Sequence, residues 1–247
     1  MSDQTKLSPA LPASATLLGL LLVLAWDALN HRYRLDARLA DPLVSAGHFT
    51  LHDHWLLTTV LHDGARWLNG VLLLALLLMV WQPLGPLRQL GRAQRLRLWL
   101  VVASGMLLVS SLKRFSGSSC PWDLVSVGTG PQATLSHWQT LFSDLSDGGP
   151  GHCFPAGHAS AGFAWVALYA ALRPHAPRAA RLALAAALLA GCALGAAQQL
   201  RGAHYMSHTL WTAWLCWAWA CLWFWPARTR ATLQATRPCA LPLRLRP

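Results

Sequence analysis

"CFPAGHASAG", residues 153–162, places a proline, a glycine and a histidine directly before an apolar segment. A helix usually begins at a polar side chain, which accepts hydrogen bonds from the first free backbone N–H groups. No Ser, Thr, Asp or Asn precedes Gly157 in this stretch. Free N–H groups at the start of a helix, together with the helix dipole, favour an anion. The stretch therefore predicts a helix that begins at an anion-binding site, where Gly157 has no Cβ to keep the ligand from the backbone.

The composition predicts an integral membrane protein. The chain has 247 residues, of which 54% are hydrophobic and 12% are charged, so several stretches are long enough to cross a bilayer. Of the 20 basic residues 18 are Arg, and there is no Glu. The Arg residues lie in short segments between apolar runs, where the positive-inside rule accounts for the net charge of +11. We therefore expect no nucleic-acid partner.

Apolar runs that reach or approach the roughly 17 to 25 residues needed to span a bilayer predict six transmembrane helices. These spans are residues 11–29, 67–84, 98–112, 158–172, 182–200 and 209–225. No repeat or linker divides the chain, so residues 1–247 are expected to form a single all-α polytopic membrane domain, a helical bundle. Apolar spacing within residues 31–66 also predicts an amphipathic helix, either on the membrane surface or packed over the bundle.

The distribution of charge predicts the orientation of the chain. The segments between spans two and three, between spans four and five, and after span six are basic and contain no acid. Such segments belong in the cytoplasm, so both termini are predicted to be cytoplasmic. The exported side then receives residues 31–66, 113–157 and 201–208. The first run is expected to be a retained helix and not a cleaved signal peptide.

Three polar clusters lie at helix ends on the exported side. They are "LKRFSGSSCPWDL" from residue 112, "GHCFPAGHAS" from residue 151 and "QQLRGAHYMSH" from residue 198. In a bundle they are expected to converge on one pocket that contains Lys113, Asp123, His152, His158, Arg201, His204 and His208. Ionisable residues at this depth are costly and are functional by default.

The residue types in this pocket suit the chemistry of phosphate. Cations neutralise the negative oxygens, which is the role expected of Lys113 and Arg201. His158, in the first turn of its helix, is placed to donate a proton to the same anion. His204 is placed to attack phosphorus as a nucleophile.

The same residues resemble the motifs of the type 2 phosphatidic acid phosphatase superfamily. Lys113 and Pro121 match its first motif, the "PAGH" that ends at His158 matches its second, and the "GAHYMS" that contains His204 matches its third. This superfamily includes bacterial lipid phosphatases and shares its helical core with vanadium haloperoxidases. The resemblance implies that His204 forms a phosphohistidine, that His158 is the general acid and that the Gly157 backbone binds phosphate.

The resemblance also implies where the protein acts and what it binds. A member of this family would lie in the bacterial inner membrane, with its active-site core, residues 113–208, facing the periplasm. It would need no metal or other cofactor. Its partners would be a lipid phosphate substrate and membrane lipids, while the sequence predicts no particular oligomeric state.

The chain departs from the family pattern among the phosphate-binding residues. Ala156 stands where the family has Ser, and with Lys113, Arg201 and Gly157 it completes the expected phosphate-binding set. Gln198 stands where the family has an Arg. Because Arg201 lies about one helical turn after Gln198, we expect it to take the place of that missing Arg.

The group that orients the nucleophile also differs from the family pattern. His208 stands four residues after His204, where the family has an Asp. A carboxylate there would fix the tautomer of His204 and stabilise its imidazolium, whereas a neutral His accepts a hydrogen bond without supplying a counter-charge. Asp123 is the alternative orienting group, from across the pocket. His204, His158, His208 and Asp123 are therefore the candidate catalytic residues.

Two cysteines are candidates for a disulfide. Cys120, which replaces an Arg of the first motif, and Cys153 both fall in the exported 113–157 segment. That compartment permits oxidation. A Cys120–Cys153 bond would tie the first motif to the second if the geometry allows it.

The function predicted from the sequence is hydrolysis of a lipid phosphate or pyrophosphate by a metal-independent membrane phosphatase. Candidate substrates are undecaprenyl pyrophosphate, phosphatidylglycerol phosphate, phosphatidic acid and the phosphate of lipid A. One alternative is a phosphotransferase that passes the phosphoryl group to another lipid such as lipid A. A second is a metal-dependent hydrolase with His158, His204 and His208 as ligands. A third is a non-catalytic lipid carrier.

Overall fold

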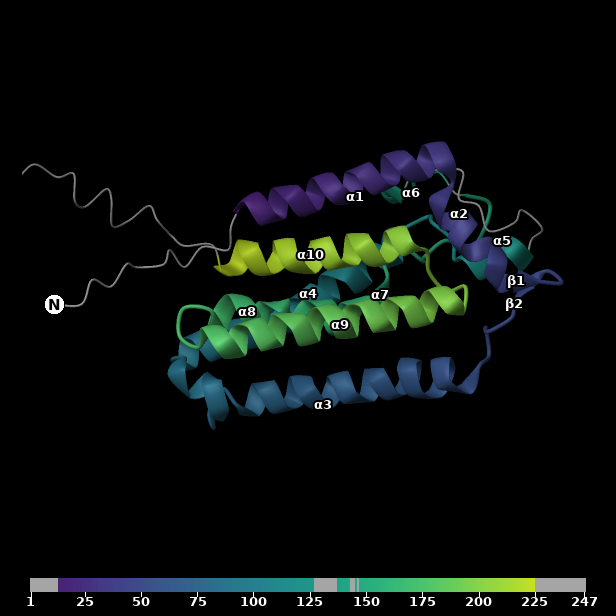
Figure 1. Cartoon of the computed structure of the whole chain (residues 1–247). Coiled ribbons are helices and arrows are strands. Elements are labelled where there is room, and N and C mark those ends of the chain that lie inside the picture. The colour runs from purple at the N-terminus through teal and green to yellow at the C-terminus, as the bar shows by residue number, and fades with distance from the viewer. Residues whose placement is uncertain (1–12, 127–136, 143–144, 146, 225–247) are drawn as a thin grey trace, which may run out of the picture.

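The computed structural model describes residues 13–126, 137–142, 145 and 147–224, and these residues are mostly helical (Figure 1). The long helices are α1 (Ala13–Tyr33), α3 (Ala65–Leu78), α4 (Arg92–Phe115), α9 (Pro177–Leu200) and α10 (Met206–Phe224). The shorter helical elements are α2 (Leu35–Ala40), η1 (Asp41–Leu43), η2 (Leu56–Gly64), η3 (Gly85–Gln89), α5 (Pro121–Ser126), α6 (His137–Phe142), α7 (Gly157–Phe163), η4 (Ala164–Val166) and α8 (Ala167–Leu172). Strands β1 (Val44–Ser45) and β2 (His48–Phe49) form a small antiparallel hairpin.

The long helices lie side by side in a bundle (Figure 1). α1 packs on α10, α10 packs on α4, α7 and α9, and α3 contacts α4 and α7. The successive elements α7, η4 and α8 pack along α9 and are largely buried. α2, α5 and the β1–β2 hairpin gather at the right-hand end of the bundle in Figure 1, which is the end that carries the segments predicted to be exported.

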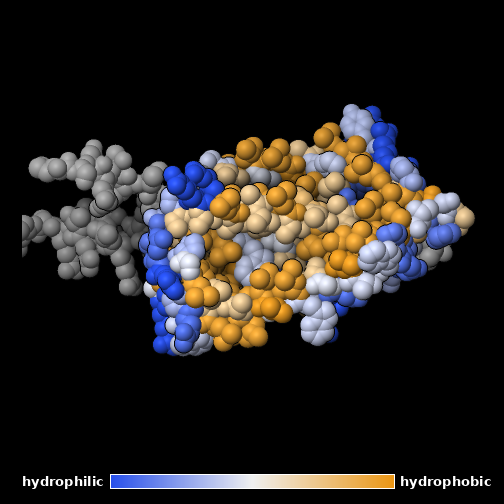
Figure 2. Space-filling view, turned by 60° about the horizontal axis from the view of Figure 1, so that its bottom comes forward, coloured by the Kyte–Doolittle hydropathy of each residue, from blue (hydrophilic) through white to orange (hydrophobic). Residues whose placement is uncertain are grey.

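Within the described residues, four helical segments are long and apolar enough to cross a membrane. They are Ala13–Tyr33, Leu56–Leu78, Arg92–Phe115 and Pro177–Leu200. Many of their apolar side chains point outward, as surfaces that face lipid do; Leu74 and Leu189, for example, are 57% and 72% exposed. Figure 2 shows these side chains as an apolar band between hydrophilic ends. The chain is therefore an all-α protein with the features of a membrane protein.

The prediction of six spans is not confirmed by this structure. Residues 157–172 are short for a span and are divided by the 3₁₀ turn η4. α10 has 19 residues but is rich in Trp, whose indole N–H makes it less apolar than Leu. Residues 11 and 12 of the first predicted span and residue 225 of the sixth lie outside the described residues. So do both termini.

The helical segment found at the second predicted span has other bounds than those predicted. It begins at Leu56 and ends at Leu78, instead of covering residues 67–84. The π-helical turns of η2 run directly into α3, so the amphipathic segment expected on the membrane surface or over the bundle is instead the first part of a span. Pro83 disfavours a helical conformation at Gln82, so the helix could not continue to residue 84 as predicted.

Small residues bring α7 close to α9. A Cβ on Gly162 would overlap the backbone of Gly191, and a Cβ on Gly191 would overlap the ring of Phe163. Glycine at such a crossing lets two helices pack backbone against backbone. This contact fixes the depth of α7 in the bundle, and with it the position of the residues at its first turn.

Candidate active site

The polar clusters predicted to converge do meet at one end of the bundle. Lys113 lies in the last turn of α4, and a Cβ on Gly157, the first residue of α7, would lie 3.9 Å from Lys113 Cδ. The backbone N–H of Trp122 in α5 donates to the carbonyl of Gly202, 3.0 Å away, in the turn between α9 and α10. Segments far apart in the sequence are thus joined around one site.

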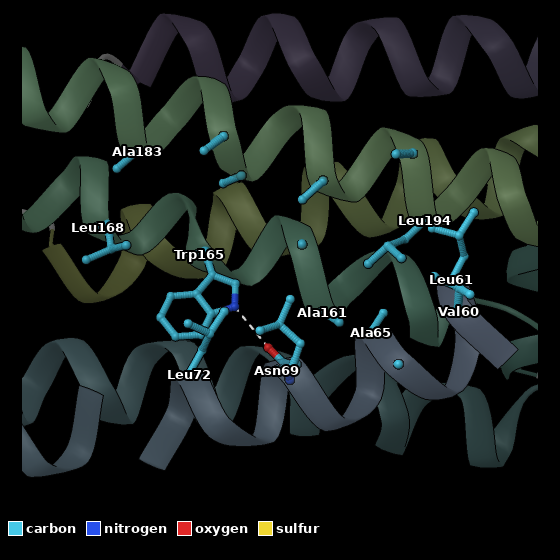
Figure 3. Close-up of a pocket in the computed structure, with 17 residues that line it drawn as sticks. Val60, Leu61, Ala65, Asn69, Leu72, Ala161, Trp165, Leu168, Ala183 and Leu194 are labelled. Atoms are coloured by element: carbon cyan, nitrogen blue, oxygen red, sulfur yellow. Dashed lines mark hydrogen bonds between the residues drawn. The ribbon is translucent and has the colours of Figure 1, made fainter. Parts of the chain in front are cut away.

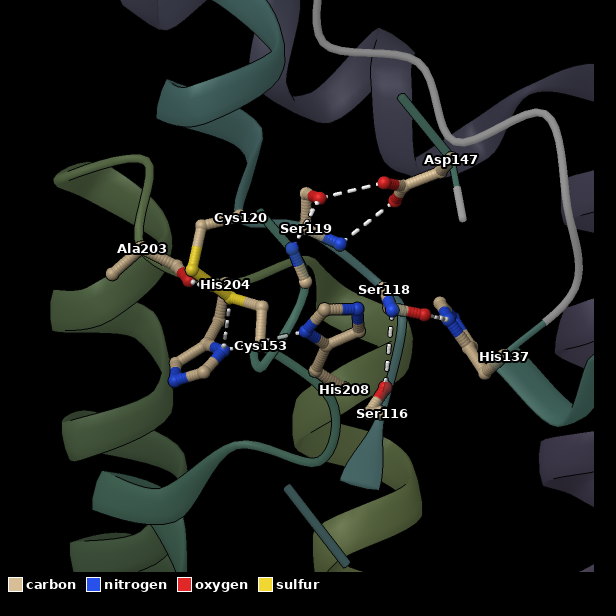
Figure 4. Close-up of a disulfide and its surroundings, with 11 residues drawn as sticks. Ser116, Ser118, Ser119, Cys120, His137, Asp147, Cys153, Ala203, His204 and His208 are labelled. Atoms are coloured by element: carbon tan, nitrogen blue, oxygen red, sulfur yellow. Dashed lines mark hydrogen bonds between the residues drawn. A yellow bond between two sulfur atoms is a disulfide. The ribbon is translucent and has the colours of Figure 1, made fainter. Parts of the chain in front are cut away.

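His204 is buried in that turn, with 4% of its surface exposed. Its Nδ1 lies 3.3 Å from His208 Nδ1 and 3.5 Å from Cys153 Sγ. Figure 4 shows that the other ring nitrogen of His204 points away from both. Burial, with the positive charges of Lys113 and His158 adding to it, lowers the pKa of His204 well below its ordinary value of 6.5. His204 is therefore neutral at neutral pH, which is the form in which a ring nitrogen can attack phosphorus.

The predicted cysteine pair forms a disulfide in the structure (Figure 4). Cys120 and Cys153 are bonded, with their Cα atoms 5.2 Å apart. The Cys153 backbone N–H also donates to the carbonyl of Ser118, 2.9 Å away. The segment after α4 and the segment before α7 are therefore held together directly beside His204.

The start of α7 has no side-chain cap, as the sequence predicts. One predicted phosphate-binding residue does not fit this geometry. Ala156 is fully buried, and its backbone N–H donates to Thr212 Oγ1 at 2.9 Å. Because a methyl side chain offers no donor and the N–H is already used, we correct the prediction by removing Ala156 from the phosphate-binding set. The next backbone N–H groups, beginning at Gly157, are the first that can face an anion.

His158 lies in the first turn of α7. Its Nε2 is buried and has no hydrogen-bond partner among the described residues. The charges of Lys113, Arg66 and Arg201 all act on its ring. A buried donor with no protein partner, surrounded by cations, is well placed for an anionic ligand.

Arg201 approaches the position at which the family pattern has an Arg. Its Nη1 donates to Gln198 Oε1 at 3.3 Å, and its Nε donates to the His52 carbonyl at 3.0 Å. The guanidinium lies 5.8 Å from the centre of the Trp122 ring. Arg201 is therefore held at the edge of the site by three parts of the chain, close to the buried amide that replaces the expected Arg.

The structure places His208, and not Asp123, at Nδ1 of His204. Asp123 lies at the start of α5, where the charges that act on it are those of Asp147 and His52. Burial raises the pKa of its carboxyl. Of the two candidate orienting groups, His208 is the one in contact with the nucleophile. The structure also leaves His152 exposed on the surface, outside the expected pocket.

A buried hydrogen-bond network that the sequence does not predict fixes the start of α10. Asp36, in α2, is 5% exposed and accepts hydrogen bonds from the backbone N–H of Ser207, at 3.1 Å, and from its hydroxyl. His137 Nε2 lies 2.7 Å from the same hydroxyl oxygen, to which it can donate. Asp36 thus caps α10 from a distant part of the chain. Because His204 and His208 flank Ser207, the network holds both histidines in place.

The metal alternative does not fit the donor atoms at the site. Among the described residues, Cys153, His204 and His208 have donor atoms within 4.8 Å of one another. The sulfur of Cys153 is part of a disulfide, so it is not available as a thiolate ligand. His158, the third ligand in the metal alternative, does not belong to this group. Two histidines alone are fewer ligands than protein zinc sites use.

An apolar cavity of about 780 Å³ opens beside the site (Figure 3). It lies between η2 and α3 on one side and α7, α8 and α9 on the other, and Leu61, Leu168 and Leu194 are among its lining residues. Within it, Trp165 Nε1 donates to Asn69 Oδ1 at 3.0 Å (Figure 3). Ala161, three residues after His158, also lines the cavity, which therefore lies against α7 just beyond its first turn.

A family model described as PAP2 superfamily matches residues 94–231, which is more than half of the chain. This match confirms the resemblance seen in the sequence motifs. Lys113, His158 and His204 lie inside the matched range, whereas η2 and α3 precede it. No curated protein and no solved structure matches the chain.

Proposed function

We propose that this chain, which belongs to the PAP2 superfamily, is a membrane phosphatase that hydrolyses a lipid phosphate or pyrophosphate through a phosphohistidine at His204. The superfamily is one of phosphatases that act on phosphate esters, often those of lipids. The observation that carries the proposal is the meeting of Lys113, the first turn of α7 and His204 around one site. The four candidate lipids named from the sequence remain the proposed substrates.

The proposed phosphate position lies between the first turn of α7 and the turn before α10. Lys113 and Arg201 supply positive charge there, and the backbone N–H of Gly157 donates to a phosphate oxygen. A phosphoryl group spreads negative charge over its equatorial oxygens as it is transferred, so fixed cations stabilise the transition state more than the substrate. This arrangement needs no metal ion to neutralise the charge.

The contact between the two histidines indicates which nitrogen attacks. For Nε2 of His204 to have a free lone pair, its Nδ1 must carry the proton and donate it to Nδ1 of His208. Bonding of phosphorus to Nε2 makes the His204 ring positive, and His208 can then accept the Nδ1 proton. His158 gives a proton to the leaving oxygen in this step and takes one from water in the next, when water breaks the phosphorus–nitrogen bond.

The apolar cavity supports a lipid as the substrate. Apart from Asn69 and the indole N–H of Trp165, its lining groups are apolar, and at α7 it is lined by Ala161 and Gly162, the residues that follow the first turn. An acyl or polyprenyl chain attached to the phosphate would lie in this cavity, where its apolar surface contacts apolar side chains and is removed from water.

The proposed setting is the bacterial inner membrane. In this arrangement the whole chain, residues 1–247, forms one domain, and the core at residues 113–208 faces the periplasm. Residues 158–172 and α10 would be the fourth and sixth of the six membrane-crossing segments, and both termini would be cytoplasmic. The Arg-rich segments between spans support this orientation.

The activity is tested by phosphate release from purified protein in mixed micelles that contain each candidate lipid. We expect release from at least one of them, and a fall of about 10³-fold or more for His204→Ala, because the bond-forming atom is lost. His175→Ala is the matched control, since His175 is exposed and lies outside the site. Unchanged thermal unfolding of both variants shows that they fold. Retained turnover in His204→Ala excludes the mechanism, and no release from any lipid contradicts the function.

Two further measurements separate the alternatives. A chelator should leave the activity unchanged, and vanadate should inhibit it, because vanadate adopts the geometry of the phosphoryl transition state. A metal-dependent hydrolase would lose its activity with the chelator. If labelled phosphate is recovered on a second lipid and not as free phosphate, the chain is a phosphotransferase.

A further inference from the structure

A histidine outside the family motifs lies directly against the proposed general acid. The rings of His62 and His158 are stacked, with their centres 3.8 Å apart and their planes inclined by 22°. His62 belongs to η2 and precedes the region that matches the family model. The stack is therefore a feature of this chain, and the superfamily motifs do not account for it.

The backbone around His62 is suited to present a side chain at a fixed place. Residues 56–64 form a π-helical segment, a rare conformation that is frequently found at functional sites. Nδ1 of His62 lies 2.8 Å from Oδ1 of Asp63, so the ring is also held from its other edge. Val60 and Leu61, just before His62, line the apolar cavity. His62 thus follows directly after two cavity-lining residues and lies against His158 in the first turn of α7.

His158 needs such a partner in order to act as a general acid. The second side-chain torsion of histidine is broad, so the ring is not fixed by its own rotamer preference. Nε2 of His158 has no hydrogen-bond partner among the described residues, so no bond from that nitrogen to this part of the chain fixes the ring plane. A proton donor must lie within hydrogen-bond reach of the leaving oxygen, and a misplacement of about 1 Å is costly.

We infer that His62 is a positioning residue, which holds the His158 ring by stacking so that Nε2 points at the leaving oxygen of the substrate. This inference rests on the proposed function, since it assigns His158 the role of general acid. In it, His62 neither bonds to phosphorus nor transfers a proton. Because the stacking of a flat ring is what holds His158, another aromatic ring at position 62 should hold it nearly as well.

The kinetic test uses two substrates that differ in their need for an acid. An alkyl phosphate has a poor leaving group, an alkoxide, that must be protonated as it departs. The nitrophenolate ion that leaves from nitrophenyl phosphate needs no protonation. We expect His62→Ala to lower kcat for the alkyl phosphate by roughly 10-fold to 100-fold with little change in KM. The same variant should leave kcat for nitrophenyl phosphate nearly unchanged, and His62→Phe should restore most of the loss. His54→Ala, which removes an exposed histidine two residues before η2, is the matched control.

Each other outcome overturns the inference. An equal loss on both substrates means that His62→Ala disturbs the fold or the phosphate site. A loss that Phe does not restore means that a ring nitrogen of His62 takes part in the chemistry.

A readout without turnover keeps this result separate from the proposed function. In histidine-labelled protein, stacking shifts the ring proton resonances of His158 by the ring current of His62. We expect those resonances to move in His62→Ala and to stay in His54→Ala, whether or not a lipid is hydrolysed. Resonances that do not move would overturn the stack itself, whereas an inactive wild-type protein with moving resonances would overturn only the phosphatase.

Discussion

Removing the Cys120–Cys153 disulfide should cost both stability and turnover. The bond joins residues separated by 33 positions, and closing a loop of that length stabilises the folded state by about 4 kcal/mol in the chain-entropy treatment. In a chain of this size, 1 kcal/mol corresponds to roughly 2 to 4 °C in Tm, so the double variant Cys120→Ala/Cys153→Ala should unfold roughly 8 to 16 °C lower. Turnover should fall by roughly 10-fold or more, because Cys153 Sγ lies 3.5 Å from His204 Nδ1 and its segment would be freed.

The assay is thermal unfolding in detergent, followed by near-ultraviolet circular dichroism, with phosphate release measured on the same samples. Reductant added to wild-type protein should reproduce both losses and should change nothing further in the double variant. Cys192→Ala is the control, since Cys192 is a free, exposed cysteine. A double variant that unfolds within 2 °C of wild type, or that keeps full turnover after losing the bond, would refute the reasoning.

Four other measurements test the packing and the electrostatics of the protein. His208→Ala should lower kcat by about 10²-fold or more by removing the acceptor at His204 Nδ1, whereas His208→Asp should retain activity; equal kcat values for the two variants would exclude an orienting role. Gly162→Ala should destabilise the protein by about 3 kcal/mol or more, measured as a lower Tm, because the added Cβ overlaps the backbone of Gly191; an unchanged Tm would contradict this packing. The pKa of His204 is lowered, so neutral nucleophile persists as the pH falls, and the acid limb of the pH–rate profile should lie well below 6.5. Burial also lowers the pKa of His137 from 6.5 to about 4. Between pH 6.5 and 4 the unfolded state therefore binds more protons than the folded state, so the free energy of unfolding should fall by about 3 kcal/mol as the pH is lowered through this range. His137→Phe should flatten this pH dependence of the Tm.

Much of the helical frame could be predicted from the sequence, because an apolar run of the right length has few other solutions in a membrane protein. The cores of α1, α4 and α9 lie where the runs predict, although α4 extends further at both ends. The extension at its start, Arg92–Arg97, reflects the good helix propensity of Arg, which a search for apolar runs does not register. The sequence did not predict that this helical segment begins as early as Leu56. Residues 56–64 mix polar and apolar side chains, a pattern that resembles a helix on the membrane surface more than a span.

The candidate site was predictable as far as the motifs extend along the chain. The order of the three clusters and the membrane face predicted for all of them place Lys113, His158 and His204 together, and they also pair the two cysteines of the segment predicted to be exported. Contacts between distant segments leave no such pattern. Asp36 and Ser207 are 171 positions apart, and neither alone marks a helix cap, so the network at α10 could not be read from spacing.

His62 did leave a sequence signal, although a weak one. "LHD" occurs at residues 51–53 and again at 61–63, and in both copies the His Nδ1 lies within 2.8 Å of the next Asp. Paired His–Asp dipeptides in a segment predicted to be exported are worth noting, but only the fold shows which copy meets the site. The second copy stacks on His158, whereas the first lies beside Trp122.

The central claim is tested most directly by trapping the phosphorylated enzyme. Protein mixed rapidly with a radiolabelled lipid phosphate and quenched in alkali, where phosphohistidine survives, should carry label within the first turnover. Mass spectrometry should place the phosphate on His204, and the label should disappear as free phosphate forms. A single turnover that releases phosphate with no labelled protein, or with the label on a residue other than His204, would contradict the account.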